Sequence, residues 1–214
     1  MSRPSRNIDQ LLIATARELL PETGCRGFSI RQLTDQAGVN LGMFHYHFKT
    51  RDHFLSLVLR GVYEEMLTSL TFQAHADRPP VDNLRAALNV LGRFARDNRF
   101  LVRRLLADAL SGEAVAQEFF RVNFPLHVKV LAELLVLGQR AGVLRKLPVL
   151  QALTFLGGAI AFPNIMVTAL EEQKMIPPTL LAHLGEDVLS DKAIAQRVDM
   201  AVRGLQTDKE TVHA

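Results

Sequence analysis

Residues 24–55, GCRGFSIRQLTDQAGVNLGMFHYHFKTRDHFL, contain two short helical patterns separated by a glycine turn. Ser29 can cap the first helix and Asn40 the second, because their side chains accept hydrogen bonds from free N–H groups. Gly38 stands between the helices, where a tight turn needs a left-handed residue, and the small Ala37 lets the helices approach closely. Apolar side chains would fill the wedge between them: Leu33, Val39 and Phe44. The pattern predicts a helix-turn-helix, whose second helix can lie in a major groove.

The rest of the chain also has helical periodicity. Before the motif, apolar residues at helical spacing form a stripe over residues 8–19, and after it a long helix is expected from Thr50 or Asp52 to about Thr71. Further helices are predicted over residues 81–97, 100–109, 113–121, 126–141, 148–170 and from Ser190 onward. No stretch alternates like a strand. We predict an all-α fold, with a three-helix DNA-binding domain over residues 1–50 and a helical domain over residues 51–214.

The charge of the chain is unevenly placed. Residues 1–51 hold seven Lys or Arg residues and four acidic ones, whereas the remaining 163 residues hold 18 of each sign. An excess of positive charge in the first quarter indicates an anionic partner there, although an ordinary solvated surface gives the same balance.

Cysteine content and hydropathy bear on the compartment. The single cysteine, Cys25, allows no internal disulfide, and residues 1–10 lack the apolar core of a secretory signal. Residues 147–170 carry no formal charge and are long enough to span a bilayer, but they contain Pro163 and Asn164, which are costly in lipid. Burial between protein helices explains this segment better. We therefore expect a cytoplasmic protein that does not enter a membrane.

Enzymatic and metal chemistry find little support in the sequence. His45 and His47 are two positions apart and would face away from each other on a helix, and the other histidines are scattered. There is no phosphate-binding glycine loop and no nucleophile elbow. Cys25 lies beside Arg26, which could activate the thiol, but a structural role is favoured. We expect no catalytic residues, no metal and no cofactor.

The motif resembles the DNA-binding domain of TetR/AcrR-family transcriptional regulators. The matching positions are Gly24, Ser29, Ile30, Arg31, Leu33, Ala37, Gly38, Val39, Gly42, Phe44, His47, Phe48 and the run Lys49–Leu55. Three positions depart from the family pattern: Thr34 replaces Ala, Asn40 replaces Ser, and His45 replaces a Tyr whose hydroxyl reaches a phosphate in family members. Whether His45 or Tyr46 takes that role is open.

The residues suggest how DNA would be contacted. The start of the second helix would reach base edges through Leu41, Gly42, Met43 and Tyr46, while Asn40 caps it. Backbone phosphates would be contacted by Ser29, Arg31, His45, Lys49 and Thr50. Arg3 and Arg6 could form an additional arm, although a disordered terminus is the more common outcome. A solvated surface role is the alternative for each, and packing is the alternative for Met43.

The C-terminal region would hold an effector site. Aromatic and polar residues among apolar neighbours are the candidates, although core residues look alike in sequence: Phe100, Arg103, Phe120, Asn123, Phe124, His127, Phe162, Asn164 and Thr168. The Pro163–Asn164 pair would break a helix and free carbonyl groups, and a kink without a ligand is the alternative.

The last two long helices would form a dimer interface, as in the family. Its expected residues are Gly157, Gly158, Ala161, Ile194, Val198, Ala201, Val202 and Leu205, and packing within one chain is the alternative.

The resemblance implies a homodimeric, ligand-responsive transcriptional regulator, most often a repressor, that binds a palindromic double-stranded DNA operator and is released by a small-molecule effector. Two alternatives remain at this point. One is a DNA-binding protein of the same fold without an effector, and the other is an all-α enzyme. Neither the operator nor the effector is identified by the sequence.

Overall fold

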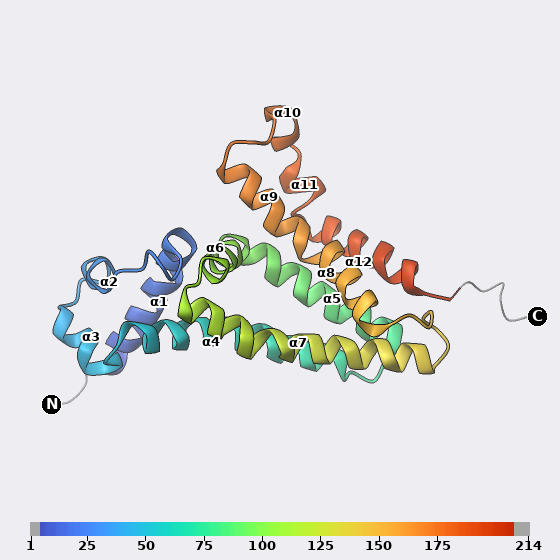
Figure 1. Ribbon diagram of the computed structural model, residues 1–214, viewed down its shortest axis with the longest axis horizontal. Coiled ribbons are helices and arrows are strands. Elements are labelled where there is room, and N and C mark those ends of the chain that lie inside the picture. The colour runs from blue at the N-terminus through green and yellow to red at the C-terminus, as the bar shows by residue number, and fades with distance from the viewer. Residues whose placement is uncertain (1–4, 208–214) are drawn as a thin grey trace, which may run out of the picture. The chain divides into compact units, whose positions relative to one another are not determined.

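The computed structural model describes residues 5–207, which are helical apart from short connections and one isolated bridge between Leu144 and Gln206 (Figure 1). The helices are α1 (Ser5–Thr23), α2 (Ile30–Ala37), α3 (Leu41–Phe48), α4 (Arg51–Ala74), α5 (Pro80–Asp97), α6 (Arg99–Leu110), α7 (Ala114–Arg140), α8 (Val149–Ile160), α9 (Phe162–Glu172), α10 (Pro178–Leu181), α11 (Leu184–Asp187) and α12 (Asp191–Leu205). The predicted all-α class, with an N-terminal helix-turn-helix and a helical remainder, is confirmed.

The chain forms two compact units. The first comprises Met1–Glu64 and Phe100–Asn123, and the second comprises Glu65–Arg99 and Phe124–Ala214. Helices α4 and α7 each contribute residues to both units. The predicted functional division after residue 50 remains a prediction.

The helix-turn-helix in the first unit forms through local interactions. The Ser29 hydroxyl accepts a hydrogen bond from Gln32 N at 3.4 Å and caps α2, and the Asn40 Oδ1 atom accepts one from Met43 N at 3.0 Å and caps α3. Gly38 ends α2 with a φ of 67°, in the left-handed region. Thr34 is buried, and its hydroxyl donates to the Arg31 carbonyl at 3.0 Å. The hydroxyl therefore needs no partner on a facing helix.

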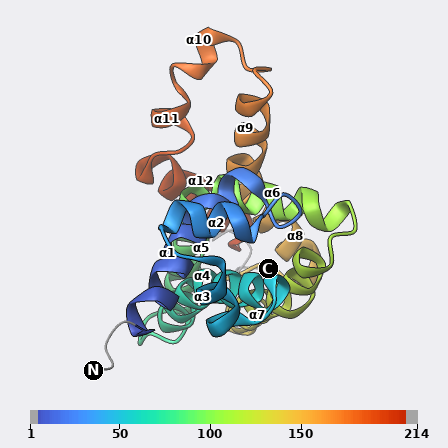
Figure 2. The same ribbon diagram turned by 90° about the vertical axis from the view of Figure 1, so that its left-hand side faces the viewer.

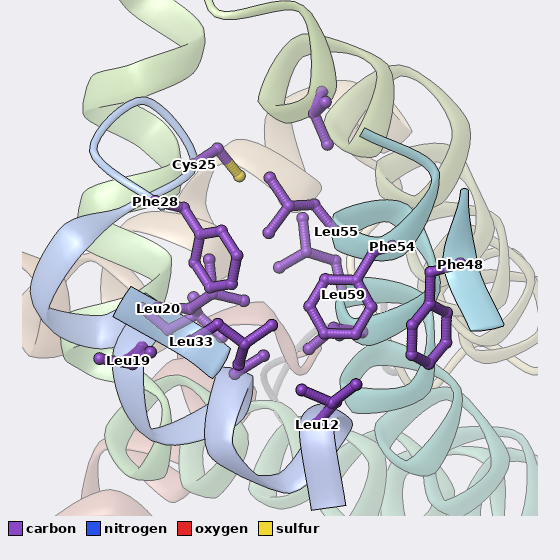
Figure 3. Close-up of a cluster of buried hydrophobic side chains, with 14 of the residues drawn as sticks. Leu12, Leu19, Leu20, Cys25, Phe28, Leu33, Phe48, Phe54, Leu55 and Leu59 are labelled. Atoms are coloured by element: carbon purple, nitrogen blue, oxygen red, sulfur yellow. The ribbon is translucent and has the colours of Figure 1, made fainter. Parts of the chain in front are cut away.

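An apolar cluster holds the first unit together (Figure 3). It joins buried side chains of α1, α2, α3 and α4 with Leu101, Leu105, Val115 and Ala116 of α6 and α7. Phe54 of α4 is fully buried in it, with ring centroids 4.6 Å from Phe48 and 5.2 Å from Phe44. Because Phe44 and Phe48 point into this cluster, the opposite face of α3 is left toward solvent.

Helix α7 runs through Pro125, where we expected two helices separated by a break. A proline inside a helix removes one hydrogen bond and crowds the preceding turn. Each half of α7 is held by apolar burial: Val115 and Ala116 lie in the core of the first unit, and Leu134 and Leu135 are buried in the second. This burial outweighs the local cost of the proline.

The apolar stripe of α12 packs within the chain, in line with the alternative considered for it. Helix α12 lies against α5 and α8. The five stripe residues are at most 5% exposed: Ile194, Val198, Ala201, Val202 and Leu205. The contact with α5 is close enough that a Cβ atom on Gly92 would lie 2.6 Å from the Ile194 Cγ2 atom. The second unit uses these residues as part of its own core.

The uncharged segment forms two helices, not one. Helices α8 and α9 together have the length and apolarity of a membrane span, but they meet at a 41° bend, and no single described helix passes that test. After α9, the chain continues through α10 and α11 to α12. Figure 2 shows α9 leading to α10 and α11 leading back from it.

Candidate nucleic-acid interface

Helix α3 presents a mixed apolar and polar face to solvent. Tyr46 is 74% exposed and Leu41 is 49% exposed, and Gly42 is exposed beside them. Met43 is half-buried, so its side chain both packs against the protein and is partly accessible from solvent. An exposed helix face with a glycine near its start can approach the base edges of a major groove closely.

The structure distinguishes the two side chains considered for the phosphate contact. The His45 Nδ1 atom lies 3.2 Å from the Lys49 carbonyl oxygen, and because that oxygen can only accept, Nδ1 carries the hydrogen. The His45 ring also packs edge-on against Phe44, with centroids 5.5 Å apart. The imidazole is therefore fixed against the end of its own helix. The Tyr46 ring lies edge-on to His47, with ring centroids 5.1 Å apart, and extends into solvent.

The residues expected to contact phosphates are exposed around α2 and α3. Ser29 and Arg31 lie at the start of α2, whose first intrahelical hydrogen bond runs from Leu33 N to Ser29 O. The N–H groups before that bond carry the partial positive charge of a helix start. Lys49 and Thr50 are exposed in the turn after α3, and the Thr50 hydroxyl accepts from His53 N at 3.3 Å. Arg3 and the side chain of Arg6 lie outside the described residues.

Sequence reasoning missed the residues that bind the turn before α2. The Asp108 Oδ2 atom accepts hydrogen bonds from Cys25 N at 2.7 Å and Arg26 N at 3.2 Å. Arg51 donates from Nε to the Phe28 carbonyl at 3.1 Å and from Nη2 to the Cys25 carbonyl. The partners of Asp108 are more than 80 positions away in sequence, so no local pattern announces them.

Cys25 has a structural role in this unit. Its side chain is fully buried in the apolar cluster, where Figure 3 shows it with Phe28 and Leu55. Burial raises the pKa of the Cys25 thiol to about 12, and the nearby carboxylates of Glu113 and Asp108 act in the same direction. A protonated, buried thiol is a poor nucleophile, which disfavours the redox role considered for it.

The candidate effector residues fall into both compact units. In the first unit, the Asn123 side-chain amide donates a hydrogen bond to the Phe119 carbonyl at 2.8 Å, and the Asn123 backbone carbonyl accepts one from the Tyr63 hydroxyl at 2.6 Å. The Phe120 ring packs edge-on against Phe119. Phe100 and Arg103 are half-buried in the same unit. The side-chain amide nitrogen and the backbone carbonyl of Asn123 thus have partners within the protein.

In the second unit, His127 is the candidate with the most perturbed chemistry. Its ring packs edge-on against Phe124, with centroids 5.0 Å apart, and burial lowers the pKa of His127 to about 4. The imidazole is therefore neutral near pH 7. Phe162, by contrast, is 52% exposed.

Asn164 and Thr168 are fully buried at the break between α8 and α9. The Asn164 amide donates to the Ile160 carbonyl at 3.0 Å, and the Thr168 hydroxyl donates to the Asn164 carbonyl at 2.8 Å. The donors of both side chains are thus used by the backbone of the kink, in line with the alternative that the kink is structural. The Asn164 Oδ1 atom has no partner among the described residues.

Exposed apolar side chains lie on the outer faces of α8 and α12 in the second unit. Leu150, Phe155 and Met200 are 72%, 47% and 64% exposed. A Cβ atom on Gly204 of α12 would lie 3.8 Å from the Phe155 ring, which shows that the two faces adjoin. Gly157 and Gly158 are exposed, and a Cβ atom on either would meet nothing within 4 Å. Ala161, at the end of α8, is half-buried.

The part of the chain that the structure describes contains no group of three or more His, Cys, Asp or Glu side chains arranged to hold a metal ion. His213 lies outside this part.

A three-helix motif with an exposed recognition helix defines a helix-turn-helix DNA-binding protein. Residues 12–58 match the family model for "Bacterial regulatory proteins, tetR family". No curated protein sequence matches the chain.

Solved structures share the fold over nearly the whole chain. A tetR-family regulatory protein from Rhodococcus RHA1 is 18% identical with a TM-score of 0.70, covering 97% of this chain and 100% of its own. HlyIIR, a hemolysin II transcriptional regulator, is 18% identical with a TM-score of 0.63, covering 96% of this chain and 100% of its own. At these identities the structures establish the fold alone. Residues 12–58 thus match a tetR-family domain, and the chain as a whole shares its fold with tetR-family regulators.

Proposed function

We propose that the protein is a homodimeric transcriptional repressor that binds a palindromic operator and releases it when a small-molecule effector binds the helical body. The observation that carries the proposal is the exposed face of α3, with Tyr46 and Leu41 directed to solvent while Phe44 and Phe48 anchor the helix in the core. Two such helices would enter successive major grooves, ~34–36 Å apart.

On this proposal, α3 divides the work between bases and backbone. Leu41, Gly42, Met43 and Tyr46 face the groove, where the apolar side chains can contact thymine methyl groups and the Tyr46 hydroxyl can donate to a base edge or phosphate. Ser29, Arg31, Lys49 and Thr50 contact phosphates. Asn40 caps α3, and the fixed His45 ring presents Nε2 as its free nitrogen. We therefore favour Tyr46 over His45 for the role of the missing family tyrosine.

Selection of bound fragments from random-sequence duplexes tests the proposal. We expect enrichment of a two-fold symmetric sequence, bound by two chains. Recovery of no enriched sequence would refute operator binding. The Tyr46→Phe variant removes only the hydroxyl, and it should weaken binding to the enriched duplex while leaving the unfolding free energy unchanged.

The proposed dimer uses the outer faces of α8 and α12 instead of the buried α12 stripe. Exposed Leu150, Phe155 and Met200 supply apolar area, and Gly157 and Gly158 allow backbones to approach closely. The Met200→Glu variant should shift the protein from dimer to monomer in sedimentation equilibrium. A matched control is Leu110→Glu, which places the same charge at an 81% exposed position in the other unit and should leave the dimer intact. Equal dissociation of both variants would contradict this interface.

The effector part of the proposal rests on the helical body, with His127 and Phe124 as the most distinctive candidates. Their ring contact places a neutral imidazole beside an aromatic ring, and small-molecule sites commonly combine aromatic surface with a placed polar group. Thermal-shift screening against a metabolite library, followed by operator release with each hit, separates this function from an effector-free DNA-binding protein. We expect such a regulator to act in the cytoplasm.

A further inference from the structure

The turn between α1 and α2 is held by a carboxylate from a distant part of the first unit. Asp108, near the end of α6, accepts hydrogen bonds from the N–H groups of Cys25 and Arg26. Gly24 precedes them with a φ of 67°, and a Cβ atom there would lie 2.4 Å from the Asp108 Oδ2 atom. Only glycine therefore leaves room for the carboxylate. Hydrogen bonds to a charged acceptor are stronger than neutral ones, so this contact fixes the turn firmly.

An arginine forms further hydrogen bonds with the same turn. Arg51, at the start of α4, donates to the carbonyls of Cys25 and Phe28, and its Nη1 atom lies 3.9 Å from the Glu113 Oε1 atom. The other Glu113 carboxylate oxygen accepts from Ala116 N at 2.7 Å and caps α7. Both ends of residues 108–113, which comprise the end of α6 and its connection to α7, are thus linked electrostatically to the turn at residues 24–28.

This turn leads directly into the DNA-contacting elements. Phe28 is followed by Ser29, the cap of α2, and α2 packs against α3. A displacement of residues 108–113 therefore acts on the start of α2 without passing along α4. We propose that Asp108 is a positioning residue for α2 and α3, and that residues 108–113 are coupled to DNA binding through the turn at residues 24–28, without transmission along the length of α4. This inference rests on the DNA binding proposed above.

Hydrogen exchange tests the coupling without a known effector. Coupling between two sites is reciprocal, so if residues 108–113 influence DNA binding, DNA must influence them. With the duplex enriched by selection, we expect slower amide exchange in α3 and also in residues 104–113 of the wild-type protein. Protection of α3 with unchanged exchange in residues 104–113 would overturn the proposal.

Two variants sharpen the test. Asp108→Asn keeps the shape but removes the charge, so the Cys25 and Arg26 amides should exchange about ten- to a hundredfold faster in the free protein. In this variant the duplex should still protect α3 but no longer residues 104–113. Glu118→Gln is the matched control, because this exposed carboxylate of α7 pairs with Arg121 and should leave both patterns unchanged.

The outcomes separate this inference from the proposed function. Unchanged exchange at Cys25 and Arg26 in Asp108→Asn would overturn the positioning role. Failure of the wild-type protein to bind any duplex would instead overturn DNA binding, and the coupling with it. If Asp108→Asn does not fold, the wild-type comparison with and without duplex still decides.

Discussion

Lys49→Ala tests the assignment of phosphate contacts, and the size of its effect follows from the structure. Lys49 is exposed in the turn after α3, and each chain of the proposed dimer supplies one copy. Each phosphate contact contributes about 0.9 to the slope of log affinity against log salt concentration. Removing two contacts should therefore reduce the slope by about 1.8. A fourfold rise in salt would then cost the variant about twelvefold less affinity than it costs the wild-type protein.

The measurement is fluorescence anisotropy with the enriched duplex at several salt concentrations, repeated with an unrelated duplex. Because phosphates carry no sequence, Lys49→Ala should weaken both complexes alike, and Arg31→Ala should behave similarly. The control is Lys129→Ala, which removes one charge from a 77% exposed site in the other unit. An unchanged slope, or a loss confined to the enriched duplex, would refute the phosphate assignment of the residue changed.

Three further predictions concern the interior. Gly92→Ala should lower the free energy of unfolding in urea by about 1–2 kcal/mol, because the new methyl group meets the Ile194 Cγ2 atom. Ile194→Leu removes that atom and should relieve the clash in the double variant. If the effects of the two substitutions on the unfolding free energy simply add, the α5–α12 packing is contradicted. Cys25 should react with a disulfide reagent at pH 8 at least about a thousandfold more slowly than the thiol introduced by Arg26→Cys, and similar rates would argue against its burial. The pKa of His127 is lowered to about 4 in the folded chain, so between pH 6.5 and 4 the unfolded chain binds a proton that the folded chain does not. The free energy of unfolding should therefore fall by about 2–3 kcal/mol as the pH drops from 7 to 4.5. His127→Gln should lose this part of the pH dependence, and an unchanged pH profile would show that His127 is not its source.

The sequence predicted those features that depend on neighbouring residues. Ser29, Asn40 and Ser190 cap helices as expected, and Gly38 takes the left-handed conformation that its position required. Each depends on a hydrogen bond or a backbone angle within three or four positions. The recognition helix could be predicted for the same reason, because its anchors Phe44 and Phe48 and its cap lie within one short segment.

Features that depend on distant partners could not be predicted in this way. The α12 stripe was correctly seen as a buried face, but periodicity does not say whether the cover comes from the same chain or another. Here α5 supplies it, through a glycine at position 92 that looks unremarkable in sequence. Pro125 likewise ends a helix by local rules, yet apolar burial on both sides carries α7 through it.

The position of Asp108 bears on how a regulator of this construction can respond to a signal. The compact unit that presents α3 includes residues 100–123, so the helices proposed to contact DNA are packed together with α6 and the first half of α7. A change that reaches α6 therefore needs no hinge at residue 50 to alter α2. It needs only to shift the Asp108 carboxylate relative to two backbone N–H groups. Because such bonds weaken steeply with distance and angle, a displacement smaller than a helical turn is enough to weaken the hold of Asp108 on the α1–α2 turn.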